Sequence, residues 1–202
     1  MGGRSERRGS AADWLVVGLG NPGREYEHTR HNVGADAVRL LAARSGQKLE
    51  LEKGLRAEMA ACTLPGGSVA VAVPTTYMND SGLAVVALVR RCGIDAVSRL
   101  VVVHDELDLP TGRVKVKVGG GTAGHRGLGS IHAHLHDPGY VRVRIGIGKP
   151  PGRQPGAEYV LRRPGRSEQA VLAVAVDQAA DAVATIVDAG VEVAMNQVNA
   201  AS

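Results

Sequence analysis

The chain has 202 residues, enough for one domain with a sizeable buried core, and its net charge is only +4. It has no Phe and few other aromatic residues, so Val, Leu, Ala and Ile must fill that core. No uninterrupted apolar run approaches the roughly 18–20 residues of a membrane span, and no signal peptide is visible. We therefore expect a cytoplasmic protein. Cys62 and Cys92 do not form a CxxC motif, and we expect them to be buried and reduced.

The charge is unevenly distributed along the chain. Residues 113–166 hold eleven Lys and Arg but only two acidic residues, which gives this segment a charge of +9. Such a segment is typical of a face that binds a polyanion, although an ordinary solvated surface can have the same composition. Only Tyr140 and Tyr159 are interleaved with these cations. This argues against stacking on unpaired bases and leaves phosphate contacts open.

The first half of the chain alternates between predicted strands and helices. Residues 1–12 are polar and basic and predict a disordered extension, so that the folded domain would span residues 13–202. Trp14 to Gly18 is a continuous apolar run, which predicts a buried strand. The sequence then predicts a helix over residues 33–44, a hairpin of strands over 57–64 and 69–73, a helix from about 80 to 91, and a buried strand over 100–103.

The second half continues this alternation. Residues 113–118 and 140–147 alternate basic and apolar side chains and predict strands, the second with Arg142 and Arg144 on one face, where both could meet a polyanion. The other predicted elements are a Gly-rich loop over 119–129 leading into a short helix through 135, a Pro/Gly loop over 149–156, and helices over 167–189 and 192–199. The pattern predicts a single α/β domain with a twisted mixed β-sheet and helices on both faces.

Gly18, Gly20 and Gly23 follow the first strand and match G-x-G-x-x-G, the phosphate-binding turn of dinucleotide-binding domains. Pro22 lies inside this motif, and the segment after it is too polar for a helix that packs on a sheet. No second strand ends in Asp or Glu about 20 residues later, as ribose binding requires. The segment instead predicts a polar crevice just past a strand end, where ligands of open α/β sheets bind.

His31 and Asp105 are the candidate proton-transfer pair. His31 lies in a polar loop before a predicted helix, and an imidazole with an ordinary pKa of about 6.5 is suited to act as a general base. A histidine that merely stabilises the loop would give the same local pattern. Asp105 belongs to the polar run after the buried strand over 100–103, and its carboxylate could hold an imidazole in the productive tautomer. No further ligands follow at a recognisable spacing, so no metal is expected.

Two further segments could bind a substrate. Asn79, after the strand over 69–73, could hold a carbonyl or a water, or could cap the next helix. Tyr77 and Met78 beside it offer apolar surface for a ligand. The Gly-rich loop over 119–127 could cradle a phosphate with its backbone N–H groups, although it lacks the GK[ST] of a P-loop.

These segments all point to one edge of one sheet, and together they resemble the bacterial-type peptidyl-tRNA hydrolases. The matching pieces are GLGNPGREYEHTRHNVG, PTTYMNDSGLAV, VVHDELDLPTG and VRVRIGIGKP, and the likeness runs from about Trp14 to about Ala189. The resemblance implies a phosphorylase/hydrolase-like sandwich that acts as a monomer without a metal or cofactor. It also implies hydrolysis of the ester between a peptide, or an N-blocked amino acid, and the 3′ end of tRNA, which releases tRNA for reuse in translation.

The resemblance further implies roles for single residues. His31 matches the base that activates water, and Asp105 matches the acid that stabilises it. Asn21 matches the residue that distinguishes blocked from free aminoacyl-tRNA. The remaining matches are Tyr77 and Asn79 at substrate-contacting positions, Tyr26 at a tRNA-contacting position, and Lys117 and Arg144 as the basic residues that hold the tRNA 5′-phosphate.

Arg126 departs from the family pattern. Family members usually read GGHNG where residues 123–127 of this chain read AGHRG, and the family's Asn contacts substrate and helps to place water. Arg126 can donate hydrogen bonds but cannot accept them, and it adds a charge, so we expect it to bind a carbonyl or a phosphate of the substrate. Two alternatives stay open. One is an RNA-binding paralogue with weakened turnover, and the other is a nucleotide-dependent oxidoreductase that uses the glycines at 18, 20 and 23.

Overall fold

A computed structural model describes residues 11–200. Most of the predicted extension over 1–12 therefore lies outside the described residues. The strands are β1 (Trp14–Gly18), β2 (Glu50–Glu52), β3 (Ala57–Leu64), β4 (Gly67–Pro74), β5 (Leu100–Glu106), β6 (Val114–Val118) and β7 (Val141–Gly146). The helices of five or more residues are α1 (Val33–Arg44), α2 (Ser81–Cys92), α3 (Arg126–Leu135), α4 (Gly156–Val160), α5 (Arg166–Ala189) and α6 (Val191–Ala200).

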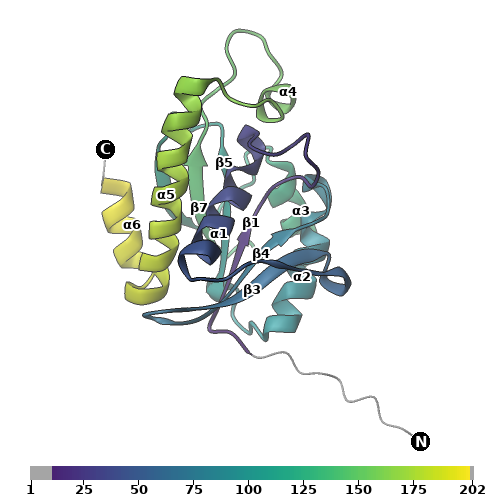
Figure 1. The fold of residues 1–202 in the computed structure, drawn as a ribbon, viewed down its shortest axis with the longest axis vertical. Coiled ribbons are helices and arrows are strands. Elements are labelled where there is room, and N and C mark those ends of the chain that lie inside the picture. Colours follow the sequence, from purple (N-terminus) through teal and green to yellow (C-terminus); the bar gives the residue numbers. More distant parts are fainter. Residues whose placement is uncertain (1–10, 201–202) are drawn as a thin grey trace, which may run out of the picture.

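Seven strands form one sheet in the order β2-β3-β4-β1-β5-β7-β6. The central strands β4, β1, β5 and β7 are parallel, while β2, β3 and β6 pair antiparallel at the two edges. Parallel strands are stable when both faces are covered. Here α1, α5 and α6 cover one face, and α2 and α3 cover the other (Figure 1). The predicted mixed sheet with helices on both faces is confirmed.

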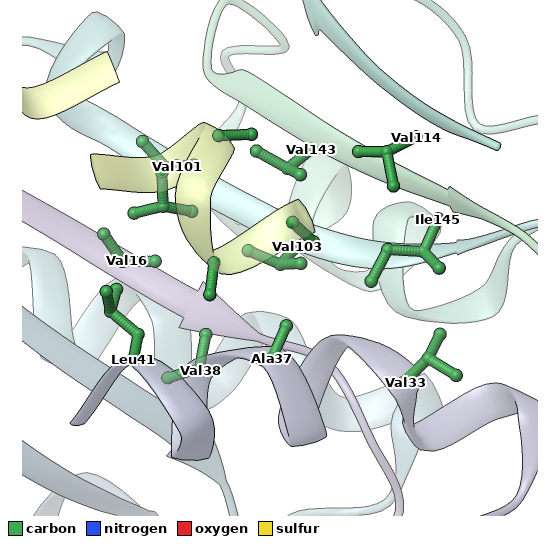
Figure 2. Packing of buried hydrophobic residues seen from close by; sticks show 14 of the residues in the cluster. Val16, Val33, Ala37, Val38, Leu41, Val101, Val103, Val114, Val143 and Ile145 are labelled. Carbon is green, nitrogen blue, oxygen red and sulfur yellow. The ribbon is translucent and has the colours of Figure 1, made fainter. Parts of the chain in front are cut away.

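Helix α1 packs closely on the middle of the sheet and fixes the start of the segment that bears His31. Figure 2 shows its apolar face, spaced three to four residues apart as an amphipathic helix requires, against the side chains of β1 and β5. Gly34 lies in its first turn, where an added Cβ would come within 2.2 Å of the carbonyl oxygen of Val103. Because residue 34 has no side chain, the helix can approach β5 two residues before Asp105.

Helix α5 is long and apolar enough, by length and composition alone, to cross a membrane, although charged and polar residues interrupt its apolar residues. Its inward residues recur at helical spacing and are buried against the sheet: Leu172, Ala175, Ala179, Val183 and Ile186. Figure 1 shows the helix running along the sheet beside α1 and α6. These contacts are those of a core helix. Cys62 and Cys92 are both buried and unpaired, as predicted.

Two expectations about the strands are wrong. The strand predicted over 100–103 continues to Glu106, because its ladder with β7 continues through the pair Glu106↔Gly146. The polar run is therefore the end of β5 and not a loop after it. Arg142 was expected to offer charge to a polyanion, but it is 3% exposed. Its guanidinium donates to the backbone carbonyls of Gly120 and Gly121 and so holds the Gly-rich loop instead.

Candidate active site

A pocket with a volume of about 430 Å³ opens at the carboxyl ends of the parallel strands. The segments around Asn21 and His31, around Asn79, around Asp105 and around Arg126 all contribute to it. Its lining includes the predicted site residues Asn21, Tyr26, His31, Tyr77, Met78, Asn79, Asp105 and Arg126. An apolar wall completes it, made of Leu107, Gly156, Ala157, Val160 and Leu161. Parallel strands bring their carboxyl ends to one edge, which explains why segments far apart in sequence meet here.

His31 and Asp105 form a buried hydrogen-bonded pair. Nδ1 of His31 lies 2.8 Å from Oδ1 of Asp105, and the two residues are 7% and 2% exposed. An ionised carboxylate only accepts hydrogen bonds, so Nδ1 of His31 bears the proton. Nε2 of His31 is then unprotonated and makes no hydrogen bond to the described residues. This is the tautomer that a general base requires.

His125 is a member of the site that the sequence analysis missed. Its Nε2 lies 2.9 Å from the same Oδ1 of Asp105. Its Nδ1 accepts a hydrogen bond from the backbone N–H of Leu128, which caps the N-terminus of α3. Both ring nitrogens are therefore engaged, and Nε2 must be the protonated one. The sequence feature that could have identified His125 is its place at the end of the Gly-rich loop, directly before Arg126.

The charge of Asp105 is stabilised by these histidines. Burial alone would raise the pKa of Asp105, but His31 and His125 outweigh it and hold this pKa below the usual range. His104, next to it in β5, is fully buried and donates from Nδ1 to the carbonyl oxygen of Asp105 at 2.7 Å. Burial, and then the neighbouring His125, lower the pKa of His104 to about 3. His104 is thus neutral beside an ionised aspartate.

The side chains of His31, Asp105 and His125 lie close enough to consider a metal site, with one ligand atom of each within 4.8 Å of the others. Two histidines and a carboxylate are a recognised ligand set. The N···O distances of 2.8 and 2.9 Å, however, are those of hydrogen bonds, and they account for the cluster. To bind a metal, His125 would have to give up either Asp105 or the N-terminus of α3.

Asn21 is held in place by its neighbours through its amide oxygen and its backbone. Its Oδ1 accepts from the backbone N–H of Met78 at 2.7 Å. Its backbone N–H and carbonyl both bond to the side chain of Asn32, at 2.8 and 2.9 Å. The amide nitrogen Nδ2 of Asn21 makes no hydrogen bond to the described residues. Asn21 can therefore offer a donor to a ligand in the pocket.

The other predicted pocket residues are less constrained. The rings of Tyr26 and Tyr77 meet edge to face with centroids 6.4 Å apart. Met78 is buried beneath the pocket, whereas Asn79 is exposed at it. Arg126 is exposed at the start of α3 and forms no ion pair with any described residue. It therefore presents an uncompensated positive charge to the pocket.

Lys117 and Arg144 do not line the pocket. They lie on one face of the β6–β7 ladder, where Lys115 pairs with Arg144 in the register. Arg144 also forms an ion pair of 3.0 Å with Glu106, which does line the pocket. Lys115, Lys117 and Arg144 thus form a cationic strip that begins beside the pocket and leads away from it.

The glycine motif does not build a dinucleotide site. That fingerprint requires a helix that opens at its third glycine. Here Gly23 begins a run of turns, and the first helical residues are Arg30 to Asn32. Gly18 has a packing role, because an added Cβ would lie 2.3 Å from the carbonyl oxygen of Gly34.

Comparisons with known proteins agree on one family. The family model described as "Peptidyl-tRNA hydrolase" matches residues 15–202. The chain is 46% identical over 198 residues to the peptidyl-tRNA hydrolase of Cutibacterium acnes, covering 92% of this chain and 98% of that one. It is 48% identical over 185 residues to that of Nocardia farcinica, covering 92% and 95%. A solved peptidyl-tRNA hydrolase from Acinetobacter baumannii aligns with a TM-score of 0.87 at 39% identity, covering 95% of this chain and 98% of that one.

Proposed function

This chain belongs to the peptidyl-tRNA hydrolase family, and we propose that the pocket around His31 is where it hydrolyses peptidyl-tRNA. It is a hydrolase that acts on the ester bond of peptidyl-tRNA and releases the tRNA. The observation that best supports the placement is the 2.8 Å hydrogen bond between His31 and Asp105 in this pocket. The comparisons favour neither an oxidoreductase nor an RNA-binding protein without turnover.

In the proposed reaction, His31 is the general base. Its Nε2 takes a proton from a water molecule, whose oxygen attacks the ester carbonyl carbon to give a tetrahedral intermediate. Asp105 stabilises the imidazolium that forms. When the intermediate collapses, the bond to the terminal ribose oxygen breaks, and His31 returns its proton to that oxygen. The products are a free peptide and a tRNA with an intact ribose hydroxyl.

Asn21 accounts for a preference for blocked substrates. Its Nδ2, which has no partner among residues 11–200, can donate a hydrogen bond to the carbonyl oxygen of an N-acyl group. A free α-ammonium group has three donors and no acceptor, so it would leave that donor unpaired in the pocket. A site with a donor placed for a substrate acceptor strongly rejects a substrate that lacks this acceptor. We therefore assign the choice between blocked and unblocked aminoacyl-tRNA to Asn21.

Donors at the pocket mouth complete the site. Asn79 and Arg126 can both donate hydrogen bonds to the ester carbonyl or to a nearby phosphate. Arg126 would replace a neutral amide with a cation at this position. We place the peptide against the apolar wall that α4 provides, because that wall faces the same pocket as His31.

The cationic strip and Tyr26 are the proposed contacts for tRNA. An acceptor stem is an A-form helix, which proteins recognise mainly by shape and phosphate. Lys117 and Arg144, close to the pocket but outside it, are placed to hold a terminal phosphate. Since one chain supplies the whole lining, we propose that a single copy is active, as part of translation in the cytoplasm.

The experiment is to incubate the protein with N-acetyl-aminoacyl-tRNA and, separately, with unblocked aminoacyl-tRNA. We expect release of the blocked amino acid and much slower release of the free one. An Asn21→Asp variant, which cannot donate, should lose this preference. Binding of tRNA without any release would favour the RNA-binding alternative, and saturable binding of a nicotinamide dinucleotide would favour the oxidoreductase.

A further inference from the structure

Arg30 directly precedes His31, yet its side chain is engaged with distant parts of the chain. Its guanidinium makes a two-pronged contact with Glu168 in the first turn of α5, with N···O distances of 2.7 and 2.6 Å. The same group lies over the ring of Tyr159, 4.1 Å from its centroid, and donates to the carbonyl oxygen of Arg162 at 3.1 Å. Arg30 is 8% exposed. Buried, bidentate arginine contacts of this kind fix geometry strongly.

Two of these contacts, to Tyr159 and to Arg162, lie in α4 or two residues after it, and α4 borders the pocket. Helix α4 has five residues and lies in the connection between β7 and α5. Together with Leu161 it supplies most of that wall. Its Tyr159 also donates from the hydroxyl to the carbonyl oxygen of Ile147 at 2.8 Å. A helix this short has little stability of its own, so its position depends on such contacts.

We propose that Arg30 is a positioning residue, which sets the distance between the α4 wall and His31 and thereby the fit of the peptide end of the substrate. Its guanidinium does not line the pocket, so it acts through α4. The inference rests on the proposed function, since it requires the peptide to occupy this pocket. The contact between Arg30 and Glu168, 138 positions apart in the sequence, would then influence substrate specificity from outside the pocket.

A shift of the α4 wall would have a specific kinetic effect. If the wall shifts while the pair of His31 and Asp105 stays intact, the substrate binds less tightly and the chemical step is unaffected. KM then rises, and kcat keeps its value and its pH dependence. A protein that is merely less stable has a smaller active fraction, which lowers kcat at unchanged KM. The rise in KM should also depend on the peptide, because the wall contacts the peptide and not the tRNA.

The test compares Arg30→Lys with the unchanged protein on two substrates bearing the same tRNA. Lysine keeps the charge but loses the bidentate contact and the stacking on Tyr159. We expect KM to rise about tenfold for an N-acetylated apolar dipeptidyl-tRNA, the scale of one lost apolar contact in a pocket. For N-acetylglycyl-tRNA the rise should be much smaller. The control is Arg44→Lys. It weakens a different arginine contact with α5, made from the end of α1 to Asp177 and, at 2.8 Å, to Asp181, away from the pocket.

A second variant, Glu168→Gln, removes the carboxylate partner without touching the segment of His31. It should reproduce the selective rise in KM, and combining it with Arg30→Lys should add little, because both remove one interaction. Melting curves establish that each variant is folded. An unchanged KM for the dipeptidyl substrate, an equal rise for both substrates, or a fall in kcat alone would overturn the inference. Absence of turnover by the unchanged protein would overturn the proposed function, and the inference with it.

Discussion

His125 donates a hydrogen bond from Nε2 to Oδ1 of Asp105 over 2.9 Å, the same oxygen that accepts from His31. Asp105 is thus held from two sides, by the segment before α1 and by the N-terminus of α3. The second donor restricts the rotation of the carboxylate and helps to keep it ionised. The Gly-rich loop thereby becomes part of the support of the catalytic base.

This relationship predicts the effect of His125→Phe. The ring volume is kept, but the N–H to Asp105 and the cap of α3 are lost. One hydrogen bond to a charged group is worth about 1.5–3 kcal/mol, so kcat should fall roughly ten- to hundredfold. Loss of the cap should lower the free energy of unfolding by about 1 kcal/mol. Steady-state kinetics and urea unfolding measure both. His134→Phe, at an exposed position of the same helix, is the control, and equal kcat in the two variants would contradict the assigned role.

His104 predicts a pH dependence of stability. Its pKa is lowered to about 3 in the folded protein, while the unfolded chain should titrate near the ordinary value of about 6.5. Between these values the unfolded state binds a proton that the folded state does not. Stability should therefore fall as the pH drops below 6.5, by about 1.4 kcal/mol per pH unit from this residue.

Urea unfolding of the protein and of His104→Gln at several pH values between 6.5 and 4.5 measures this contribution. The two proteins have the same carboxylates, so the titration of these groups cancels when their slopes are compared. For the variant, the free energy of unfolding should fall less steeply as the pH drops, by the share that His104 contributes, even if the variant is less stable at pH 7. Parallel slopes for the two proteins would show that His104 is protonated when folded.

Lys117 predicts a change in the salt dependence of tRNA binding. It is exposed on the cationic strip, and we expect it to contact phosphate. Lys117→Ala should weaken binding of all tRNAs alike and reduce the slope of log K against log salt by about one. Lys53→Ala, near the opposite edge of the sheet, should leave the slope unchanged. An effect confined to particular tRNAs would argue for base contact instead.

The sheet and most residues of the pocket could be predicted from the sequence. Apolar runs predict the buried strands, and parallel strands bring Asn21, Asn79 and Asp105 to one edge whatever their separation along the chain. The end of β5 was mispredicted because hydrophobicity stops at Val103, whereas the backbone ladder with β7 continues. The pattern of apolar side chains does not show where the backbone hydrogen bonding between two strands ends.

Contacts made by long polar side chains were beyond sequence reasoning. The alternation around Arg142 correctly places it on one face of β7, but its burial depends on carbonyl groups of the Gly-rich loop. His125 meets Asp105 only because that loop turns back over β5. The partner of Arg30 is Glu168, in the first turn of another helix. Each contact depends on the path of a loop, for which the local residue pattern holds no signal.

The central claim is that His31 is the base that activates water. The most direct measurement is single-turnover release of the N-acetyl amino acid from N-acetyl-aminoacyl-tRNA by His31→Ala and by His28→Ala, an exposed histidine of the same segment. We predict that His31→Ala slows release about 10²- to 10⁴-fold while still binding tRNA, and that His28→Ala stays close to the unchanged protein. Release by His31→Ala at the rate of the unchanged protein would contradict the account.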